Sequence, residues 1–415
     1  MKIGTLFIAS LLICRLAAGQ EKGATLPAWK EGYLDIHFIN IGEGGNASFL
    51  VMPDGTTMLV DIGDMKIAPD AKEIIHIKAN REKTVPELVE KYVRQFHPDT
   101  KKPVIDYALI THFHSDHFGE IHDSANISTK GKYNLFGITA LYDKIPFGTM
   151  IDRAYPDYNF PNDLAVADKS IGEYIKFVRY QVGAGHMQAQ KFKVGVADQL
   201  VLKKKPAAYP GFSIRNICGN GVIWTGEKEL TTSIIHPSSF AGSPIPNENH
   251  LSNGMRISYG NFDYFTGGDL PGYKWPYSAA WDDVESHVAP VIGPVDVACF
   301  NHHGWLDAQN EFYVRTVRPR VWVGQVWHAS QPGEEVLYRV ASTVLYPGPR
   351  DVFTTNMHDA NFRIQDFLIE KVCKATYGHI VVRVAPGGKT YKVVVLDPDD
   401  AQYKVKSVFG PYESR

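Results

Sequence analysis

The sequence predicts an α/β fold in which mixed β-sheets are covered by helices. Segments with the two-residue alternation of strands are interleaved with segments whose apolar residues recur at helical spacing. Glycine and proline turn signals separate the strand-like segments. The chain has 415 residues, of which 44% are hydrophobic, so it can bury a sizeable core. Strands that alternate with helices in this way favour sheets with helices packed on their faces.

The first predicted strands lie close together near the N-terminal end. They are residues 34–39, 47–52 and 57–60. A glycine-rich turn at 42–45 follows the first strand, and Pro53-Asp54-Gly55 has the composition of a tight hairpin turn between the second and third. The third strand ends in Asp61-Ile62-Gly63. We therefore expect one short antiparallel unit in this region.

A helix and a buried strand are predicted next. Thr84 and Glu87 form the pattern of a capping box, and Pro86 suits the first helical turn. An apolar stripe at helical spacing follows, made of Leu88, Val89, Tyr92, Val93 and Phe96. Residues 104–110 are dense in apolar side chains and predict a buried strand, which ends directly before a histidine-rich segment.

The interval from about residue 121 to 230 is less regular. Residues 133–160 are rich in Tyr, Phe, Pro and Asp, so we interpret the interval as a long insertion over one face of the fold. Within and after it, further strands are predicted at 196–203, 212–218, 231–235, 256–259 and 264–266. Helices are predicted at 170–182, 311–317 and 334–342, and a C-terminal hairpin at about 379–397 with its turn at Gly387-Gly388.

The N-terminal residues 1–19 have the pattern of a cleaved secretory signal peptide. Lys2 precedes an apolar run at 3–13, which is shorter than the roughly 20 residues that a membrane-spanning helix needs, and small residues follow at 17–19. Lipidation at Cys14 is the alternative, but the bulky residues 11–13 before it disfavour a lipoprotein. We expect a secreted or periplasmic protein without a transmembrane segment.

Charge and cysteine content exclude several classes of protein. With 43 basic and 45 acidic residues the formal net charge is −2, so no basic surface for long nucleic acid is indicated. This balance favours a small-molecule or surface-tethered substrate. Three cysteines remain after the signal peptide and none forms a CxxC pair, so the fold is not a disulfide scaffold. The sequence leaves the oligomeric state open.

The segment 111–119 carries the strongest chemical signal. His112, His114, Asp116 and His117 offer four potential metal ligands within six residues, directly after a buried strand. Neutral imidazoles together with a carboxylate suit zinc, although iron or manganese can occupy such mixed sites. A histidine-rich surface loop without function is the alternative, and the HxHxDH spacing at a strand end disfavours it.

This HxHxDH motif resembles the metal motif of the metallo-β-lactamase superfamily. Three other segments resemble that superfamily's motifs and fall in its order, namely residues 57–63, 265–269 and 300–304. The resemblance implies a metallo-β-lactamase-type αββα sandwich of two mixed sheets flanked by helices over about residues 30–400.

A narrower resemblance concerns residues 37–44, the Pro53-Asp54-Gly55 turn and residues 302–304. They look like the metallo-β-lactamase-like domain of DNA-uptake competence proteins and like bacterial phosphorylcholine esterases. Those relatives act on phosphodiesters. This chain departs from them at Asn40 and Glu43, where Asp and Gln are usual, so the substrate stays open.

Carried over residue by residue, the resemblance implies a two-metal site. His112 and His114 would hold the first ion, and Asp269 would bridge to the second. The second ion would be held by Asp116, His117 and His302. His303 is the alternative ligand, or it contacts the substrate. For the first ion, His250 is a candidate third ligand, whereas the Asn-x-x-Ser pattern of Asn249 and Ser252 indicates a substrate-binding group instead.

The implied activity is that of a secreted dinuclear zinc hydrolase. Two ions would generate a bridging hydroxide that attacks a phosphodiester or other phosphoester. Asp116 would also orient the nucleophile, and His303 or His328 would supply a proton or stabilise the leaving group. The runner-up function is amide or ester hydrolysis, including lactone or β-lactam opening. A secreted binding protein with an inactive site is the third hypothesis, and it is disfavoured because the ligand positions are retained.

Overall fold

The computed structural model describes residues 22–42, 44–67, 83–123, 125–236, 245–272 and 280–415. The predicted signal peptide at residues 1–19 lies outside this part of the chain. No helix in the described ranges is long and apolar enough to cross a membrane.

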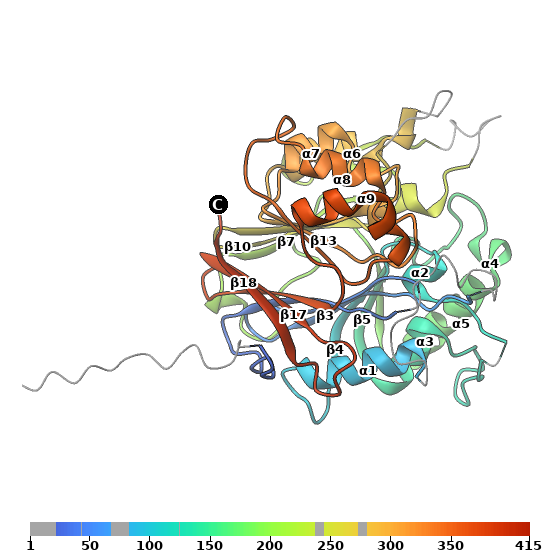
Figure 1. The fold of residues 1–415 in the computed structure, drawn as a ribbon. Coiled ribbons are helices and arrows are strands. Elements are labelled where there is room, and N and C mark those ends of the chain that lie inside the picture. Colours follow the sequence, from blue (N-terminus) through green and yellow to red (C-terminus); the bar gives the residue numbers. More distant parts are fainter. Residues whose placement is uncertain (1–21, 43, 68–82, 124, 237–244, 273–279) are drawn as a thin grey trace, which may run out of the picture.

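Two mixed sheets lie face to face, each with nine strands in the described residues (Figure 1). The first sheet, in spatial order, consists of β18 (Val405–Glu413), β17 (Thr390–Leu396), β16 (His379–Val384), β1 (Leu34–Phe38), β2 (Ala47–Val51), β3 (Thr57–Ile62), β4 (Ile105–Leu109), β5 (Phe147–Asp152) and β6 (Gln188–Lys191). The second consists of β15 (Cys373–Ala375), β14 (Asp351–Thr354), β13 (Val321–Gly324), β12 (Val297–Cys299), β11 (Phe262–Thr266), β10 (Gly254–Tyr259), β7 (Phe212–Gly219), β8 (Val222–Trp224) and β9 (Thr231–Ser233).

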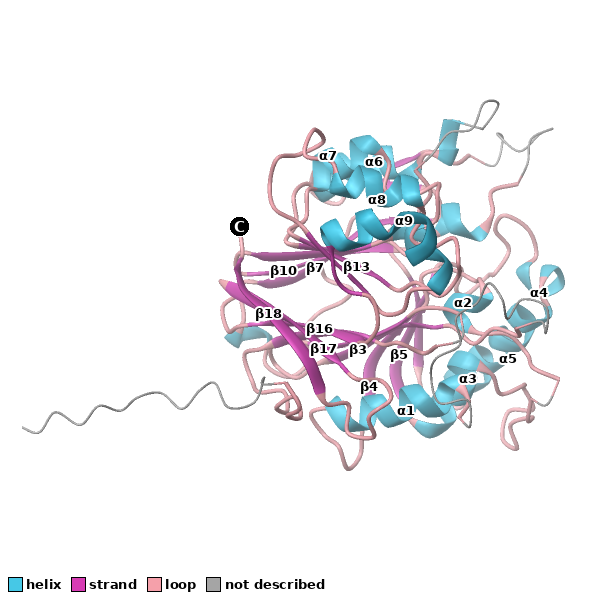
Figure 2. Ribbon diagram, viewed as in Figure 1, coloured by secondary structure: helices cyan, strands magenta, loops and turns pink. Residues whose placement is uncertain are grey.

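Helices cover the outer face of each sheet (Figure 2). On the first sheet lie α1 (Val85–Phe96), α3 (Gly137–Lys144) and α5 (Lys169–Gly183), with the short α2 (Ser115–Phe118) and α4 (Leu164–Ala167) at its end. On the second lie α6 (Val284–Ile292), α7 (Glu311–Val317), α8 (Glu334–Ala341) and α9 (Asp359–Val372). The predicted αββα arrangement of two mixed sheets flanked by helices is confirmed.

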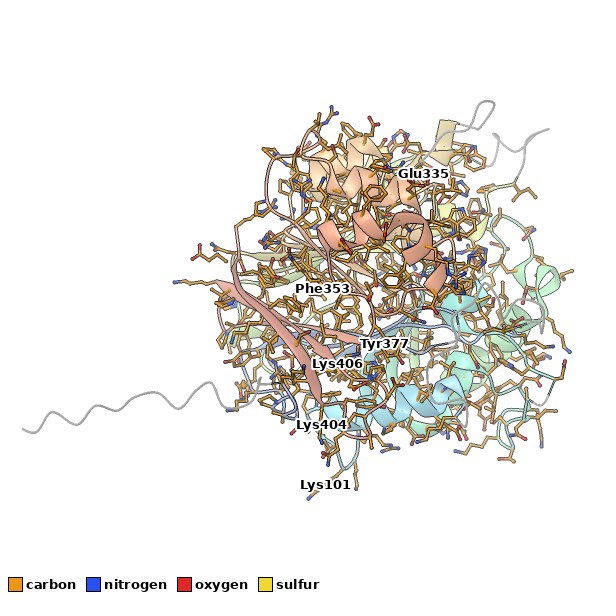
Figure 3. The ribbon with its side chains drawn as sticks, in the orientation of Figure 1. Lys101, Glu335, Phe353, Tyr377, Lys404 and Lys406 are labelled. Carbon is orange, nitrogen blue, oxygen red and sulfur yellow. The ribbon has the colours of Figure 1, made fainter. Side chains whose placement is uncertain are left out.

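The core between the sheets is apolar and continuous. Leu34, Ile36 and Phe38 of β1 are fully buried and belong to the same cluster as Ile257 of β10. Phe353 of β14 also lies between the sheets, where its ring meets Phe409 of β18 at 5.1 Å (Figure 3). Burial of such side chains stabilises the sandwich by roughly 1.5–3 kcal/mol for each large apolar residue. The two sheets are therefore held in a fixed relation.

Each sheet has a parallel half, and these halves position the functional loops. β3 to β6 run parallel in the first sheet, and β11 to β15 run parallel in the second. The loops after β4, β11 and β12 leave from the carboxyl ends of these strands, which is where parallel α/β sheets place ligands.

The N-terminal elements follow the sequence prediction closely. β1, β2, β3 and β4 lie where strand patterns were found, and the capping box of Thr84 and Glu87 is present at the start of α1. The C-terminal hairpin is formed by β16 and β17. No strand spans residues 196–203, and β18, α6 and α9 were not predicted.

The interval 121–230 differs from the predicted insertion. α3 and β5 lie within residues 133–160, and both β5 and β6 extend the first sheet in parallel beyond β4. β5 carries no clear period because it is buried along almost its whole length, and a strand covered on both faces needs no alternation of apolar and polar residues, whereas β6 is a short, partly exposed edge strand. Much of the interval therefore builds the scaffold.

Two buried histidines lie under the first sheet, beside α1. His37 Nδ1 lies 2.9 Å from the Tyr92 hydroxyl, and His379 Nδ1 accepts a hydrogen bond from the Asn40 N–H at 3.0 Å. Burial lowers the pKa of His37 to about 4 and that of His379 to about 3. Both are therefore neutral in the folded protein at pH values where an unfolded chain binds protons, below about 6.5.

We expect the protein to lose stability as the pH falls from 6.5 towards 4. In this window the unfolded state binds more protons at these histidines, so the free energy of unfolding falls by about 1.4 kcal/mol per pH unit for each histidine. His379→Gln should flatten this dependence, and the slope is the readout because the variant is less stable at every pH. Chemical denaturation of both proteins at pH 7, 6 and 5 measures it, and equal slopes would contradict the prediction.

Candidate metal centre

The histidine-rich loop is held against the end of β3 by two glycines. A Cβ at Gly63 would lie 2.2 Å from the Asp116 carbonyl oxygen, and one at Gly45 would lie 2.4 Å from the same atom. The Asn46 N–H also donates to this oxygen at 2.8 Å. The backbone at Asp116 can approach this closely only because both positions lack a side chain.

Four of the predicted ligands form one buried group. Asp116, His117, Asp269 and His303 each offer a ligand atom, and these atoms lie within 4.8 Å of one another. The Nε2 atom of His303 is 2.9 Å from Asp116 Oδ2 and 3.3 Å from Asp269 Oδ2. His117 Nε2 is 3.1 Å from Asp269 Oδ1. This arrangement could hold a metal ion.

A second group shares one carboxylate with the first. His112, His114 and Asp269 place their ligand atoms within the same limit of 4.8 Å. His112 Nε2 lies 3.1 Å from His114 Nδ1 and 3.7 Å from Asp269 Oδ2. Asp269 belongs to both groups, which is the position that a bridging ligand would take.

Hydrogen bonds outside the groups fix the orientation of two imidazoles. His117 Nδ1 lies 2.8 Å from Asp61 Oδ2, and Asp61 also accepts from the N–H and hydroxyl of Thr111. His303 Nδ1 donates to the Gln325 carbonyl oxygen at 2.8 Å. Protons on these Nδ1 atoms leave the Nε2 lone pairs free to bind metal, as in other metal sites whose histidines are held by a carboxylate or carbonyl.

The donor set fits a metal cation. The two Nε2 atoms of His117 and His303 face each other at 3.3 Å, so when both rings are neutral and protonated on Nδ1, neither Nε2 can donate to the other. Asp269 Oδ1 accepts no well-oriented hydrogen bond among the described residues, although it is fully buried. Facing lone pairs and a buried, under-satisfied carboxylate are costly unless a cation lies between them. Imidazole and carboxylate donors of this kind suit zinc.

The pKa values show how strongly the pocket favours positive charge. Burial lowers the pKa of His303, but the carboxylates of Asp269 and Asp116 outweigh it and raise this pKa to about 9. Burial likewise raises the pKa of Asp116, yet His117 and His303 hold it at about 2. The carboxylates therefore stay ionised, and the pocket attracts a cation.

His302 does not lie in either group, so the preference for it over His303 is corrected. Its Nε2 is 4.0 Å from Asp269 Oδ2, and its Nδ1 lies 2.7 Å from Asp307. His302 and His303 both have left-handed backbone conformations, with φ of 47° and 55°. This turn sends His303 into the buried group and His302 towards the surface. Sequence spacing alone does not show which of two adjacent histidines lies in the metal-ligating group.

His250 is also absent from both groups, contrary to its candidacy as a third ligand. Its Nε2 is 3.0 Å from Asp282 and its Nδ1 is 2.7 Å from Asn247 Oδ1, so both ring nitrogens are engaged elsewhere. Asn249 lies beside the site, with its Nδ2 atom 3.2 Å from His302 Nε2. Its Oδ1 atom has no hydrogen-bond partner in the described part of the chain.

His328 lies near the site but belongs to neither of the two groups of metal-ligating side chains. Its Nδ1 is 2.7 Å from the Ser330 hydroxyl, and its ring contacts Trp305 and Trp327. The roles of Asp307 and Gln325 are not visible in the sequence, because their contacts depend on how separate loops meet. Asp61 was part of a recognised motif, but its bond to His117 was not predicted.

No protein-family model matches the chain, and no curated protein matches it. The solved structures that are similar include the metallo-β-lactamase fold protein YhfI from Bacillus subtilis. That structure is 12% identical with a TM-score of 0.38, and the match covers 84% of this chain and 98% of that chain.

The amount of zinc that a variant binds should depend on which of the two groups loses a ligand. Asp269→Ala removes the shared carboxylate and should abolish most zinc binding, whereas His303→Ala removes a ligand from one group only and should lower bound zinc by about half. His250→Ala is the matched control and should retain the full content. Mass spectrometry of zinc-saturated, desalted proteins measures the ratio, with circular dichroism to show that each variant is folded. Unchanged zinc in Asp269→Ala would rule out a shared site.

Proposed function

We propose that the protein is a secreted or periplasmic metal-dependent hydrolase that uses two zinc ions and acts on phosphodiester or other phosphoester substrates. The observation that carries this proposal is the sharing of Asp269 by two groups of metal-ligating side chains. Two cations held on one carboxylate supply Lewis acidity and lower the pKa of a bound water, which suits hydrolysis.

The chain's own residues define how a substrate reaches the site. The side chains of His112, His117 and His303 are at most 1% exposed, whereas that of His302 is 19% exposed. His114 is also partly exposed, and we place the opening of the site between the sides of His302 and His114. There the amide of Asn249, whose Oδ1 has no hydrogen-bond partner among the residues that the structure describes, can bind a polar group of the substrate.

Asp116 has two roles in this proposal. Its Oδ2 atom lies 2.9 Å from His303 Nε2 and 3.7 Å from His117 Nε2, so it helps to hold the group of Asp116, His117, Asp269 and His303 together. Its side chain is 12% exposed, more than that of Asp269, so it can also orient an attacking water on the accessible side. Loss of this carboxylate removes a ligand and an orienting group together.

Support for phosphoester chemistry comes from the resemblance of residues 37–44 and 302–304 to enzymes that act on phosphodiesters. Asn40, one of the departures from that pattern, bonds the Thr355 carbonyl and the Gly42 N–H, so it shapes the loop. Amide or ester hydrolysis, including lactone or β-lactam opening, is the runner-up because the same ligand set serves both reactions. The net charge of −2 supports a small or surface-tethered substrate.

Zinc-loaded protein should hydrolyse bis-(p-nitrophenyl) phosphate, with inorganic phosphate as a competitive inhibitor, and should not cleave long duplex DNA. A chelator should abolish the activity and added zinc should restore it. Asp116→Ala should lower kcat by at least about 100-fold, in the range found for groups that position a nucleophile. His250→Ala should leave kcat near that of the unaltered protein.

The same assay distinguishes phosphoester hydrolysis from the runner-up function, amide or ester hydrolysis. A lactone and a β-lactam are tested beside the phosphodiester on one preparation of known metal content. Lactone or β-lactam turnover without phosphoester cleavage or phosphate inhibition would establish amide or ester hydrolysis as the function instead. Full activity of Asp116→Ala would contradict the role given to this residue.

A further inference from the structure

A continuous series of aromatic ring contacts lies beside the metal groups. It begins at His303, whose ring meets Trp327 edge-on at 5.8 Å, and continues from Trp327 to His328 at 5.5 Å. His328 contacts Trp305 at 5.7 Å, and Trp305 stacks on His302 at 6.0 Å with 27° between the planes. We call His302, Trp305, Trp327 and His328 the ring wall.

The ring wall is partly open to solvent, unlike the aromatic side chains of the core. All four of its rings are partly exposed, whereas Trp322 and Tyr313, nearby in the same half of the molecule, are fully buried. The Trp327 Nε1 atom is buried without a hydrogen-bond partner in the described residues.

The wall is held firmly by two loops that leave adjacent parallel strands, β12 and β13. The Gly333 N–H donates to the Gly304 carbonyl at 2.8 Å, and a Cβ at Gly304 would lie 2.9 Å from Pro332 Cβ. The left-handed backbone at His302 and His303 turns one ring outward and the other into the metal group. Such conformations persist where surrounding contacts enforce them, often at ligand sites.

The charge of the wall indicates what it can bind. Residues 302–308 and 325–333 contain no lysine or arginine, and their one acidic side chain, Asp307, is engaged by His302. The wall therefore offers no lysine or arginine to a phosphate or carboxylate, and its His302 is already paired with Asp307. An anionic group would be bound by the metals, and the rings complement an uncharged, flat part of the same molecule.

We propose that the ring wall is a subsite for a flat, uncharged ring, such as an aryl group or a nucleobase, attached to the anionic group that the metal centre binds. This inference rests on the proposed function and narrows its substrates to esters that carry such a ring. Trp305 is the contact to test, because it touches His302 and His328 of the wall, whereas Trp327 also touches His303 of the metal-ligating group.

Binding of two non-hydrolysable probes, phenylphosphonate and methylphosphonate, to zinc-loaded protein tests this inference. They share the anionic group and differ in the ring. Stacking of the phenyl ring adds to the gain from burying its apolar area, so calorimetry should show phenylphosphonate binding roughly tenfold more tightly. Trp305→Leu should bring the ratio near one and leave the affinity for methylphosphonate unchanged, and Trp305→Phe should retain most of the preference.

Trp224→Leu is the matched control, since Trp224 is also partly exposed but lies in β8, where it contacts Arg215. This variant should keep the full ratio between the affinities for phenylphosphonate and methylphosphonate. Equal binding of the two probes to the unaltered protein, or a full ratio in Trp305→Leu, would overturn the inference. Because the probes are not hydrolysed, a protein without phosphoesterase activity can still show the ratio, so failure of the proposed function is distinguished from failure of the subsite.

Discussion

The burial of Asp269 beside His117, His303 and a second carboxylate, Asp116, is the interaction on which the rest of the structure depends. Asp269 is 1% exposed, so water cannot solvate its charge, and removing an ion from water costs several kcal/mol even in real proteins. Nearby imidazoles offset part of this cost, and a cation bound between the groups would offset the remainder. The surrounding fold serves to hold these side chains within one small volume.

The two sheets supply different parts of the metal-ligating site. The first sheet supplies the loop after β4, and the second supplies Asp269 after β11 and His303 after β12. A small shift of one sheet against the other would separate the two halves of the site. The apolar core between the sheets and the bond from Ser48 to Gln325 Oε1 at 2.9 Å oppose such a shift. Packing far from the site thus has a direct effect on its geometry.

Behind the site, one buried carboxyl group secures the loop that carries the two adjacent histidines. Glu285 is fully buried and accepts hydrogen bonds from Asn301 Nδ2 at 2.7 Å and from the Gln309 N–H at 2.8 Å. Burial raises its pKa to about 8. Together with the bond from His303 to the Gln325 carbonyl, this contact fixes the strained turn that the metal group and the ring wall both require.

Much of this architecture could be predicted from the sequence, because local patterns determine it. The strands around Pro53-Asp54-Gly55 and the capping box at Thr84 are set by neighbouring residues. The ligands at 112–117 and Asp269 were found through spacing and resemblance. The choice between His302 and His303 depends on two left-handed residues, and the loss of His250 depends on an ion pair with Asp282. β5 was missed because a strand covered on both faces shows no alternation, and β6 was missed because it is a short, polar edge strand.

The central claim is that two cations share Asp269. Anomalous diffraction from crystals of the zinc-saturated protein, collected on either side of the zinc absorption edge, tests it most directly. The account predicts two peaks about 3.5–4 Å apart. One should lie beside His112 and His114 and the other beside Asp116, His117 and His303, with Asp269 in contact with both. Absence of zinc from this pocket, or a single ion that Asp269 does not contact, would contradict the account.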